Sequence, residues 1–300
     1  MNQLGLSEVA VDTSEAVAET RGANGMSTPQ YQNAWDTFQA QGPFDGIWAS
    51  PPCQTFSLAG SGSGRRALDS VVELIQDRTF EDIKSLQATS RYLGDERTGL
   101  VLVPLHYVYE LRPQFVVFEQ VPSVLPVWEA CSSVLRGLGY SSWTGVIDAA
   151  DYGVPARRKR AYLIARNDGG VAVPPPPTAS VTMVEALGWG FVKRPAHTIT
   201  SKTGVTRSAS GTQGTYRKAI KEGEFIFKPG GSNTPSKSAK SGIGAEYPPG
   251  LINTSLEEES ILQTYPPGFI FRGNKSERGI QIGNAVPPLM AKRVLEMFTT

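Results

Sequence analysis

Residues 44–57 read FDGIWASPPCQTFS, an apolar stretch that runs into two prolines and a cysteine. The stretch 44–49 predicts a buried strand, and the prolines end it because proline has no N–H for a sheet ladder. Cys53 then lies on a loop at the carboxyl edge of the sheet, where ligand and catalytic sites of open α/β sheets gather. A cysteine on such a loop, near backbone N–H groups and arginines, can act as a nucleophile. The alternative, a buried structural cysteine, fits Cys131 better, because prolines and polar residues around Cys53 are poor core material.

Strand and helix patterns alternate on both sides of this stretch. Continuous apolar runs predict buried strands, and apolar residues at helical spacing predict helices. The expected strands are Glu8–Asp12, Phe44–Ala49, Phe115–Phe118, Gly145–Ile147 and Arg160–Ala165. The expected helices are Ser14–Arg21, Leu100–Leu111, Trp128–Leu138, Leu256–Tyr265 and Pro287–Phe298. This alternation predicts an α/β fold with a largely parallel sheet.

The composition changes after Arg166 and divides the chain into three parts. Residues 1–167 carry the strand–helix alternation, residues 168–250 are rich in Gly, Ser, Thr and Lys, and order returns in residues 251–300. Between Lys193 and Lys240 the basic residues far outnumber the two acids, Glu222 and Glu224. A basic segment in an otherwise balanced chain indicates either a phosphate-facing surface or a solvated loop. We therefore expect a core, a smaller basic lobe at 168–250, and a segment returning to the core.

The composition also excludes several classes of protein. Two cysteines are too few for a disulfide scaffold. The histidines, His106 and His197, stand far apart, and no Cys/His cluster has the spacing of a zinc site, so we expect no metal. No histidine lies in a partner motif that would make Cys53 the nucleophile of a hydrolase. Because no apolar run could span a membrane and no signal pattern opens the chain, we expect a cytoplasmic protein.

Three further segments carry side chains that suit chemistry. Glu119 ends the apolar run Phe115–Phe118 at the expected carboxyl edge, Arg158 and Arg160 lie in a basic block before a strand, and Asn284 lies in a Gly-Asn turn read as opening a helix. A carboxylate there can work as a general acid, and arginines can hold phosphates or an oxyanion. Taken alone, Glu119 is better explained as a surface acid and the arginine block as an exposed basic turn. For the Gly-Asn turn the alternative is simple helix capping.

Taken together and in this order, the segments resemble those of the cytosine-C5 DNA methyltransferases. The nearest likeness is to compact phage-type members, which carry ASPPCQ-F, EQVP--LP-WE and IGNAVPP, and it runs from about Leu6 to Leu295. It implies a Rossmann-like, S-adenosylmethionine-dependent sheet with a small inserted target-recognition lobe at residues 168–250. The implied substrate is double-stranded DNA, from which the target base must be extruded. The expected role is in a restriction–modification system or a phage, as a monomer.

The resemblance assigns catalytic roles to four residues. Cys53 matches the nucleophile that adds to C6 of cytosine, and Glu119 matches the acid that hydrogen-bonds N3 and the exocyclic amine. Arg158 and Arg160 match the two arginines of a Gln-x-Arg-x-Arg block, with Arg158 expected to contact the base. The sulfur at 53, the carboxylate at 119 and the guanidinium at 158 are therefore expected to converge on one pyrimidine.

The resemblance also assigns the cofactor site. Asp12 matches the acid that holds the ribose hydroxyls of S-adenosylmethionine, Asn284 and Val286 match a turn beside the cofactor, and Pro52 matches the proline that shapes the loop. A block that supports the recognition lobe is matched by Ser255, Glu258 and Gln263.

The sequence departs from the family pattern in places. A glycine-rich D-L-F-x-G-x-G-G segment is absent, Gln120 stands where most members have Asn, and Ala156 replaces the first Gln of the arginine block. The missing segment predicts a shortened copy, or a DNA-binding remnant without a cofactor pocket, as alternatives to an active enzyme. A transfer-RNA cytosine methyltransferase is a third alternative. Binding of S-adenosylhomocysteine, and methylation of DNA against transfer RNA, would distinguish them.

Overall fold

The computed structural model describes residues 7–27, 33–36, 44–52, 56, 68–93, 95–200, 213–230 and 253–299. Its centre is a four-stranded sheet in the order β1-β2-β4-β3. The strands are β1 (Gly46–Ala49), β2 (Phe115–Gln120), β3 (Ser141–Asp148) and β4 (Lys159–Arg166). They cover the four central strands expected from the sequence. Among the described residues, no helix is both long and apolar enough to cross a membrane.

The sheet is mixed, which corrects the expectation of a largely parallel one. β1 pairs with β2 in parallel, with Ala49 opposite Phe118. β4 pairs antiparallel with both β2 and β3. The reason is the short connection between β3 and β4, which holds only the 3-10 turn Ala149–Tyr152. Without a crossover helix, two successive strands return as an antiparallel pair.

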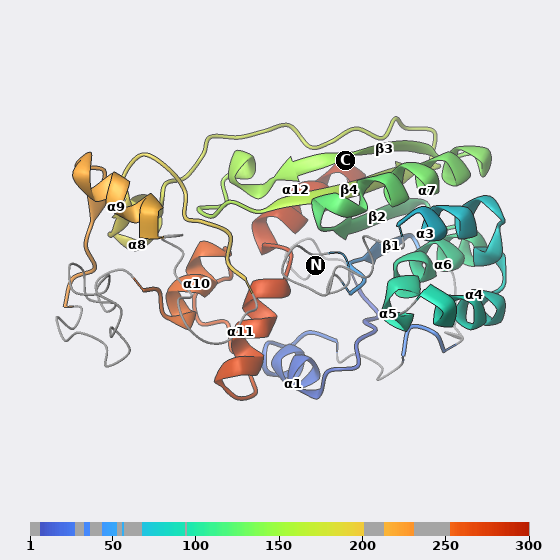
Figure 1. Cartoon of the computed structure of the whole chain (residues 1–300), viewed down its shortest axis with the longest axis horizontal. Coiled ribbons are helices and arrows are strands. Elements are labelled where there is room, and N and C mark those ends of the chain that lie inside the picture. The colour runs from blue at the N-terminus through green and yellow to red at the C-terminus, as the bar shows by residue number, and fades with distance from the viewer. Residues whose placement is uncertain are drawn as a thin grey trace.

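Helices cover one face of the sheet (Figure 1). Side chains such as Phe118 and Leu163 point to this face and are fully buried there with Trp128. The indole N–H of Trp128 donates to the carbonyl of Ala161 at 3.2 Å, which fixes its helix on the sheet. The helices near this core are α3 (Leu68–Gln76), α4 (Ile83–Ser90), α5 (Glu96–Gly99), α6 (Val103–Leu111) and α7 (Leu125–Gly137). Short 3-10 turns at Thr79–Glu81, Arg91–Leu93, Leu100–Leu102 and Pro122–Val124 connect them.

The opposite face of the sheet belongs to a second core that continues into the lobe. Val117, Tyr162 and Ile164 point to this face and share one buried cluster with Met290 of α12 (Pro288–Thr299) and Trp189 of the lobe. The lobe has its own two-stranded sheet, separate from the main sheet. Its elements are α8 (Met183–Leu187), β5 (Gly190–Phe191), α9 (Gln213–Lys221) and β6 (Phe225–Ile226). The division at residues 168 and 250 stays a proposal.

Glu258 fastens the lobe to the returning segment. Its carboxylate accepts a hydrogen bond from the indole of Trp189 at 3.0 Å and pairs with Lys228 at 2.7 Å. Burial works against ionisation of Glu258, but hydrogen bonds from Lys228, the backbone of Ser255 and Trp189 outweigh it and lower the pKa. The charged form is therefore the one that holds the lobe in place.

The returning segment contains one helix that the sequence did not predict. α10 (Leu256–Leu262) and α12 match the expected helices, but α11 (Lys275–Asn284) lies between them. Its start carries a clear signal, because the side chains of Asn274 and Glu277 form a reciprocal capping box. Asn284 therefore ends a helix and does not open one, which corrects the reading of the Gly-Asn turn.

The N-terminal part confirms one expectation and corrects another. α1 (Glu15–Ala23) is capped by Ser14, whose hydroxyl accepts from the backbone of Val17 at 3.3 Å, as expected. The expected strand Glu8–Asp12 is reduced to an isolated bridge at Val11. The side chain of Asn24 exchanges hydrogen bonds with the backbone of Ile270, at 2.8 and 3.0 Å, and so ties α1 to the loop before α11.

Candidate active site

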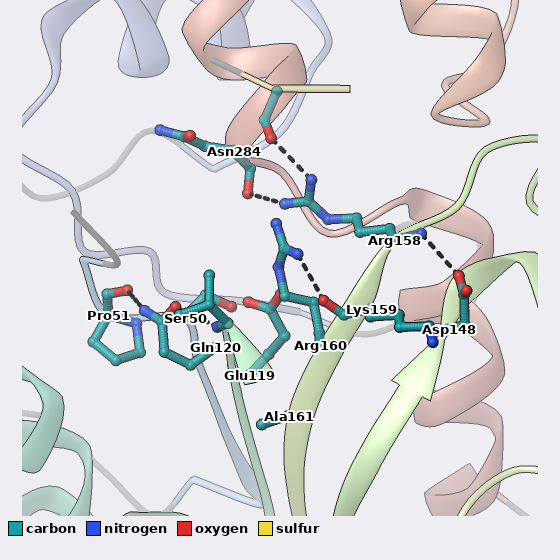
Figure 2. A network of polar contacts seen from close by, with 12 residues as sticks. Ser50, Pro51, Glu119, Gln120, Asp148, Arg158, Lys159, Arg160, Ala161 and Asn284 are labelled. Carbon is teal, nitrogen blue, oxygen red and sulfur yellow. Dashed lines mark hydrogen bonds and ion pairs between the residues drawn. The ribbon is translucent and has the colours of Figure 1, made fainter. Parts of the chain in front are cut away.

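The carboxyl ends of β1 and β2 meet at one edge of the sheet because the two strands are parallel. Pro51 follows β1 there, and Gln120 ends β2. The amide of Gln120 donates to the carbonyl of Pro51 at 2.6 Å, and its oxygen accepts from the backbone of Val121 at 2.5 Å (Figure 2). The buried Gln120 side chain thus joins the loop after β1 to the end of β2.

A second contact joins the same loop to the chain after β2. The hydroxyl of Ser123 donates to the carbonyl of Phe56 at 2.9 Å, and the ring of Phe56 is fully buried. Cys53 itself lies outside the described residues, so its position stays a prediction. The loop that carries it is nevertheless fixed at Pro51 and at Phe56, both times to the segment that follows Glu119.

Replacing Gln120 with leucine is expected to lower the free energy of unfolding by about 1–3 kcal/mol, because the carbonyl of Pro51 then loses its buried donor. Urea denaturation measures the change. Ser133→Ala is the matched control, since the hydroxyl of Ser133 makes an exposed bond to the carbonyl of Glu129 and its loss should stay within about 0.5 kcal/mol. A Gln120→Leu protein as stable as the parent would show that this contact does not hold the loop.

Glu119 and Arg160 form a nearly buried ion pair at this edge. The Nε of Arg160 lies 3.1 Å from Oε1 of Glu119, and their side chains are 16% and 6% exposed. Glu119 lies opposite Tyr162 on the neighbouring strand, so Arg160 lies two residues along the same face. The contact is an ion pair without hydrogen-bond geometry, since Oε1 has no hydrogen-bond partner among the residues that the structure describes. A buried carboxylate oxygen that accepts no hydrogen bond from these residues can accept one from a bound ligand.

Tyr162 lies opposite Glu119 on β4, on the same face of the sheet. Its side chain is almost fully buried, and burial raises its pKa above the ordinary value, with the charge of Glu119 adding to the effect. The phenol therefore stays protonated and adds no negative charge beside Glu119.

Arg158 contacts the end of α11. Its guanidinium donates to the carbonyls of Gly283 and Asn284, both at 2.9 Å, at the end of α11 (Figure 2). Its backbone N–H donates to the carboxylate of Asp148 at 2.9 Å. The structure pairs Glu119 with Arg160 and joins the guanidinium of Arg158 to the end of α11. The expected convergence of positions 53, 119 and 158 on one pyrimidine stays a prediction.

The residues expected at the cofactor lie on several elements. The carboxylate of Asp12 accepts from the backbone of Ser14 at 2.8 Å, just before α1. Pro52 follows β1, Asn284 is exposed at the end of α11, and Val286 is half-buried. Within the part of the chain that is described, no hydrogen bond joins Asp12 to Asn284, so their convergence on one ligand stays a prediction.

Sequence reasoning missed three residues that build the edge. Gln120 stood in the motif but was treated only as a replacement for Asn, although it anchors the loop. Ser123 and Asp148 carried no motif signal, and only the fold shows what they hold. By contrast, Cys131 is buried as expected, and burial raises the pKa of its thiol well above the ordinary value.

Comparisons with known proteins show which family the chain is similar to. Residues 84–180 match the profile of the C-5 cytosine-specific DNA methylase family. The chain is similar to the type II methyltransferase M1.HphI of Haemophilus parahaemolyticus, at 27% identity over 84% of this chain and 67% of the relative. It is also similar to the type II methyltransferase M.MthTI of Methanothermobacter thermautotrophicus, at 26% identity over 83% of this chain and 76% of the relative. The solved S. pombe Dnmt2 methyltransferase has the same fold, with a TM-score of 0.60 at 14% identity over 99% of this chain and 92% of that one.

Proposed function

The chain belongs to the C-5 cytosine-specific DNA methyltransferases, whose methyl donor is S-adenosylmethionine, and we propose that Cys53, Glu119 and Arg160 carry the reaction. The observation that supports this assignment is the buried Glu119–Arg160 pair at the sheet edge, where the anchored loop of Cys53 begins and ends. In this proposal Arg160 takes the role at the base that the resemblance gave to Arg158, because among the described residues Arg160 is the one that forms an ion pair with Glu119.

Glu119 and Arg160 together match one edge of cytosine. The ring nitrogen N3 and the exocyclic amine lie side by side, and a protonated or ionised carboxyl can hydrogen-bond both. The carbonyl at C2 lies on the other side of N3, where the guanidinium of Arg160 can donate. Because these atoms are paired inside a duplex, the base must be extruded before it can meet the pair.

Cys53 supplies the electrons that cytosine lacks. Its thiolate forms a bond to C6, and the electron pair of the C5–C6 double bond moves to C5 while Glu119 holds N3 in its protonated form. S-adenosylmethionine, when bound, would supply the methyl group to C5, its sulfur–methyl bond breaking with release of S-adenosylhomocysteine. A base, for which a water molecule suffices, removes the proton from C5, the double bond forms again, and the sulfur of Cys53 leaves.

The donor set of the described residues fits this cofactor in part. The carboxylate of Asp12 can accept hydrogen bonds from the hydroxyls of a ribose, and the exposed Asn284 amide can both donate and accept. We propose that Asp12, Asn284, Val286 and Pro52 line the cofactor site.

The lobe is proposed to read the DNA. α9 carries Arg217, Lys218 and Lys221, a basic set suited to phosphates. The type II names of the relatives support a role in restriction and modification. We further propose a monomer that acts on double-stranded DNA in a bacterial or phage-infected cell.

The experiment compares two nucleic acids with tritiated S-adenosylmethionine. We expect label in duplex DNA and not in transfer RNA, and a covalent complex with duplex DNA that contains 5-fluorocytosine, because fluorine at C5 cannot leave as a proton does. Label in transfer RNA alone would overturn the choice of substrate. Failure to bind S-adenosylhomocysteine, with DNA binding intact, would identify a DNA-binding remnant.

A further inference from the structure

We propose that Arg158 is a positioning residue for the cofactor side of the site, and that it does not touch the cytosine. The proposal rests on the function proposed above. Its basis is a juxtaposition that the sequence does not reveal. The guanidinium of Arg158 and the amide of Gln263 both donate hydrogen bonds to carbonyls in the last turn of α11. That turn ends at Asn284, one of the residues proposed at the cofactor.

Three successive carbonyls of α11 are satisfied by these two side chains. Gln263 donates to Ile282 at 2.8 Å, and Arg158 donates to Gly283 and Asn284 at 2.9 Å. The last carbonyls of a helix have no partner within the helix, and its C-terminal end carries partial negative charge. A buried cation with two parallel donors meets both needs. Arg158 is 3% exposed and Gln263 is 1% exposed, so water does not replace them.

Arg158 is itself held rigidly on the sheet side. Asp148 accepts from the backbone N–H of Arg158 at 2.9 Å and also from that of Ala150 at 3.3 Å, where it caps the turn between β3 and β4. Two residues further on, Arg160 contacts Glu119 at 3.1 Å. Arg158 and Arg160 thus lie on one short segment (Figure 2). The side chain of Arg160 contacts Glu119, where the base is proposed to bind, and the side chain of Arg158 contacts the end of α11.

The end of α11 decides where the proposed cofactor residues lie. Asn284 is its last residue, and Ala285 already has extended backbone, with its N–H bonded to the carbonyl of Gln281 at 3.2 Å. Val286 follows directly. Loss of the Arg158 contacts therefore frees the turn 283–286, and we expect affinity for the cofactor to fall while the chemistry at the base remains.

The test compares Arg158→Gln, Arg158→Lys, Gln263→Met and Arg160→Gln by calorimetric binding of S-adenosylhomocysteine. Arg158→Gln and Gln263→Met are expected to raise the dissociation constant by about tenfold or more, since each leaves buried carbonyls without a donor. The lysine variant keeps the charge but has a single donor nitrogen in place of the two that Arg158 aims at the two carbonyls, so it should lie between. Arg160→Gln should stay within about twofold of the parent while the covalent complex with 5-fluorocytosine DNA forms more slowly.

Hydrogen exchange supplies a readout that needs neither cofactor nor DNA. Arg158→Gln and Gln263→Met should each speed exchange of the amides at 281–286, and the double variant should add little, because both act on one helix end. Lys84→Gln is the control, an exposed cation on α4, and it should change neither exchange nor affinity.

Two results would overturn the proposal. One is an Arg158→Gln protein with parental exchange at 281–286 and parental affinity for S-adenosylhomocysteine. The other is an Arg158→Gln protein that, saturated with cofactor, still forms the covalent complex as slowly as Arg160→Gln. If the parent itself transferred no methyl group, the proposed function would fail, but the exchange experiment would still decide the role of Arg158.

Discussion

Cys53→Ala is expected to reduce methyl transfer by about 10⁴-fold or more, the order of loss that follows removal of a covalent nucleophile. Without the sulfur, no electron pair is pushed to C5, and C5 of cytosine is too weak a nucleophile to take the methyl group. Binding of duplex DNA should persist, because the substitution removes a single sulfur atom. Single-turnover methylation and DNA binding measured side by side give both values.

The other cysteine is the control for this prediction. Cys131 is fully buried in the helical core, and burial raises its pKa, so it is a poor nucleophile. Cys131→Ala should therefore still form the covalent complex with 5-fluorocytosine DNA, and Cys53→Ala should not. A covalent complex that survives in Cys53→Ala would move the nucleophile to another residue.

Glu119→Gln is expected to slow transfer by about 10²–10⁴-fold, the usual contribution of a positioned acid. The amide cannot hold the proton that N3 needs when sulfur adds to C6. The same change leaves the guanidinium of Arg160 almost buried without its counter-charge, which costs up to about 3–5 kcal/mol of unfolding free energy. Rapid-quench methylation and urea denaturation separate the two effects.

An exposed glutamate controls for the loss of charge alone. Glu129 lies exposed on α7, and Glu129→Gln should change unfolding free energy by less than about 0.5 kcal/mol. Transfer at the parental rate by Glu119→Gln would remove this carboxyl from the reaction and leave the pair with a structural role only.

Elements that are marked by a run of apolar residues or by a helix-capping residue were predictable from the sequence. The run Phe115–Phe118 is buried on both faces, and Ser14 caps α1 as expected. Strand direction was not predictable, because a strand buried on both faces has the same composition whether its neighbour runs parallel or antiparallel. Here the hairpin between β3 and β4 set the direction.

The partners of the two arginines depend on parts of the chain that a local pattern does not contain. Arg158 and Arg160 lie two apart and share one motif, so the sequence alone gives no reason to separate them. The structure separates them because β4 begins at Lys159, and Arg158 precedes it, within reach of the end of α11. A capping box at Asn274 was the available signal for α11, and it would have placed Asn284 at a helix end.

The bond between Arg158 and Gly283 joins residues 125 positions apart in the chain. A polypeptide is made from its N-terminus, so the sheet and the Glu119–Arg160 contact can form while the lobe is still being synthesised. The end of α11 is not yet present at that stage, and the closing of so long a loop comes late in folding. A ribosome-bound chain that stops inside the lobe would therefore hold the catalytic carboxylate with its arginine, yet would bind the methyl donor only after α11 has emerged.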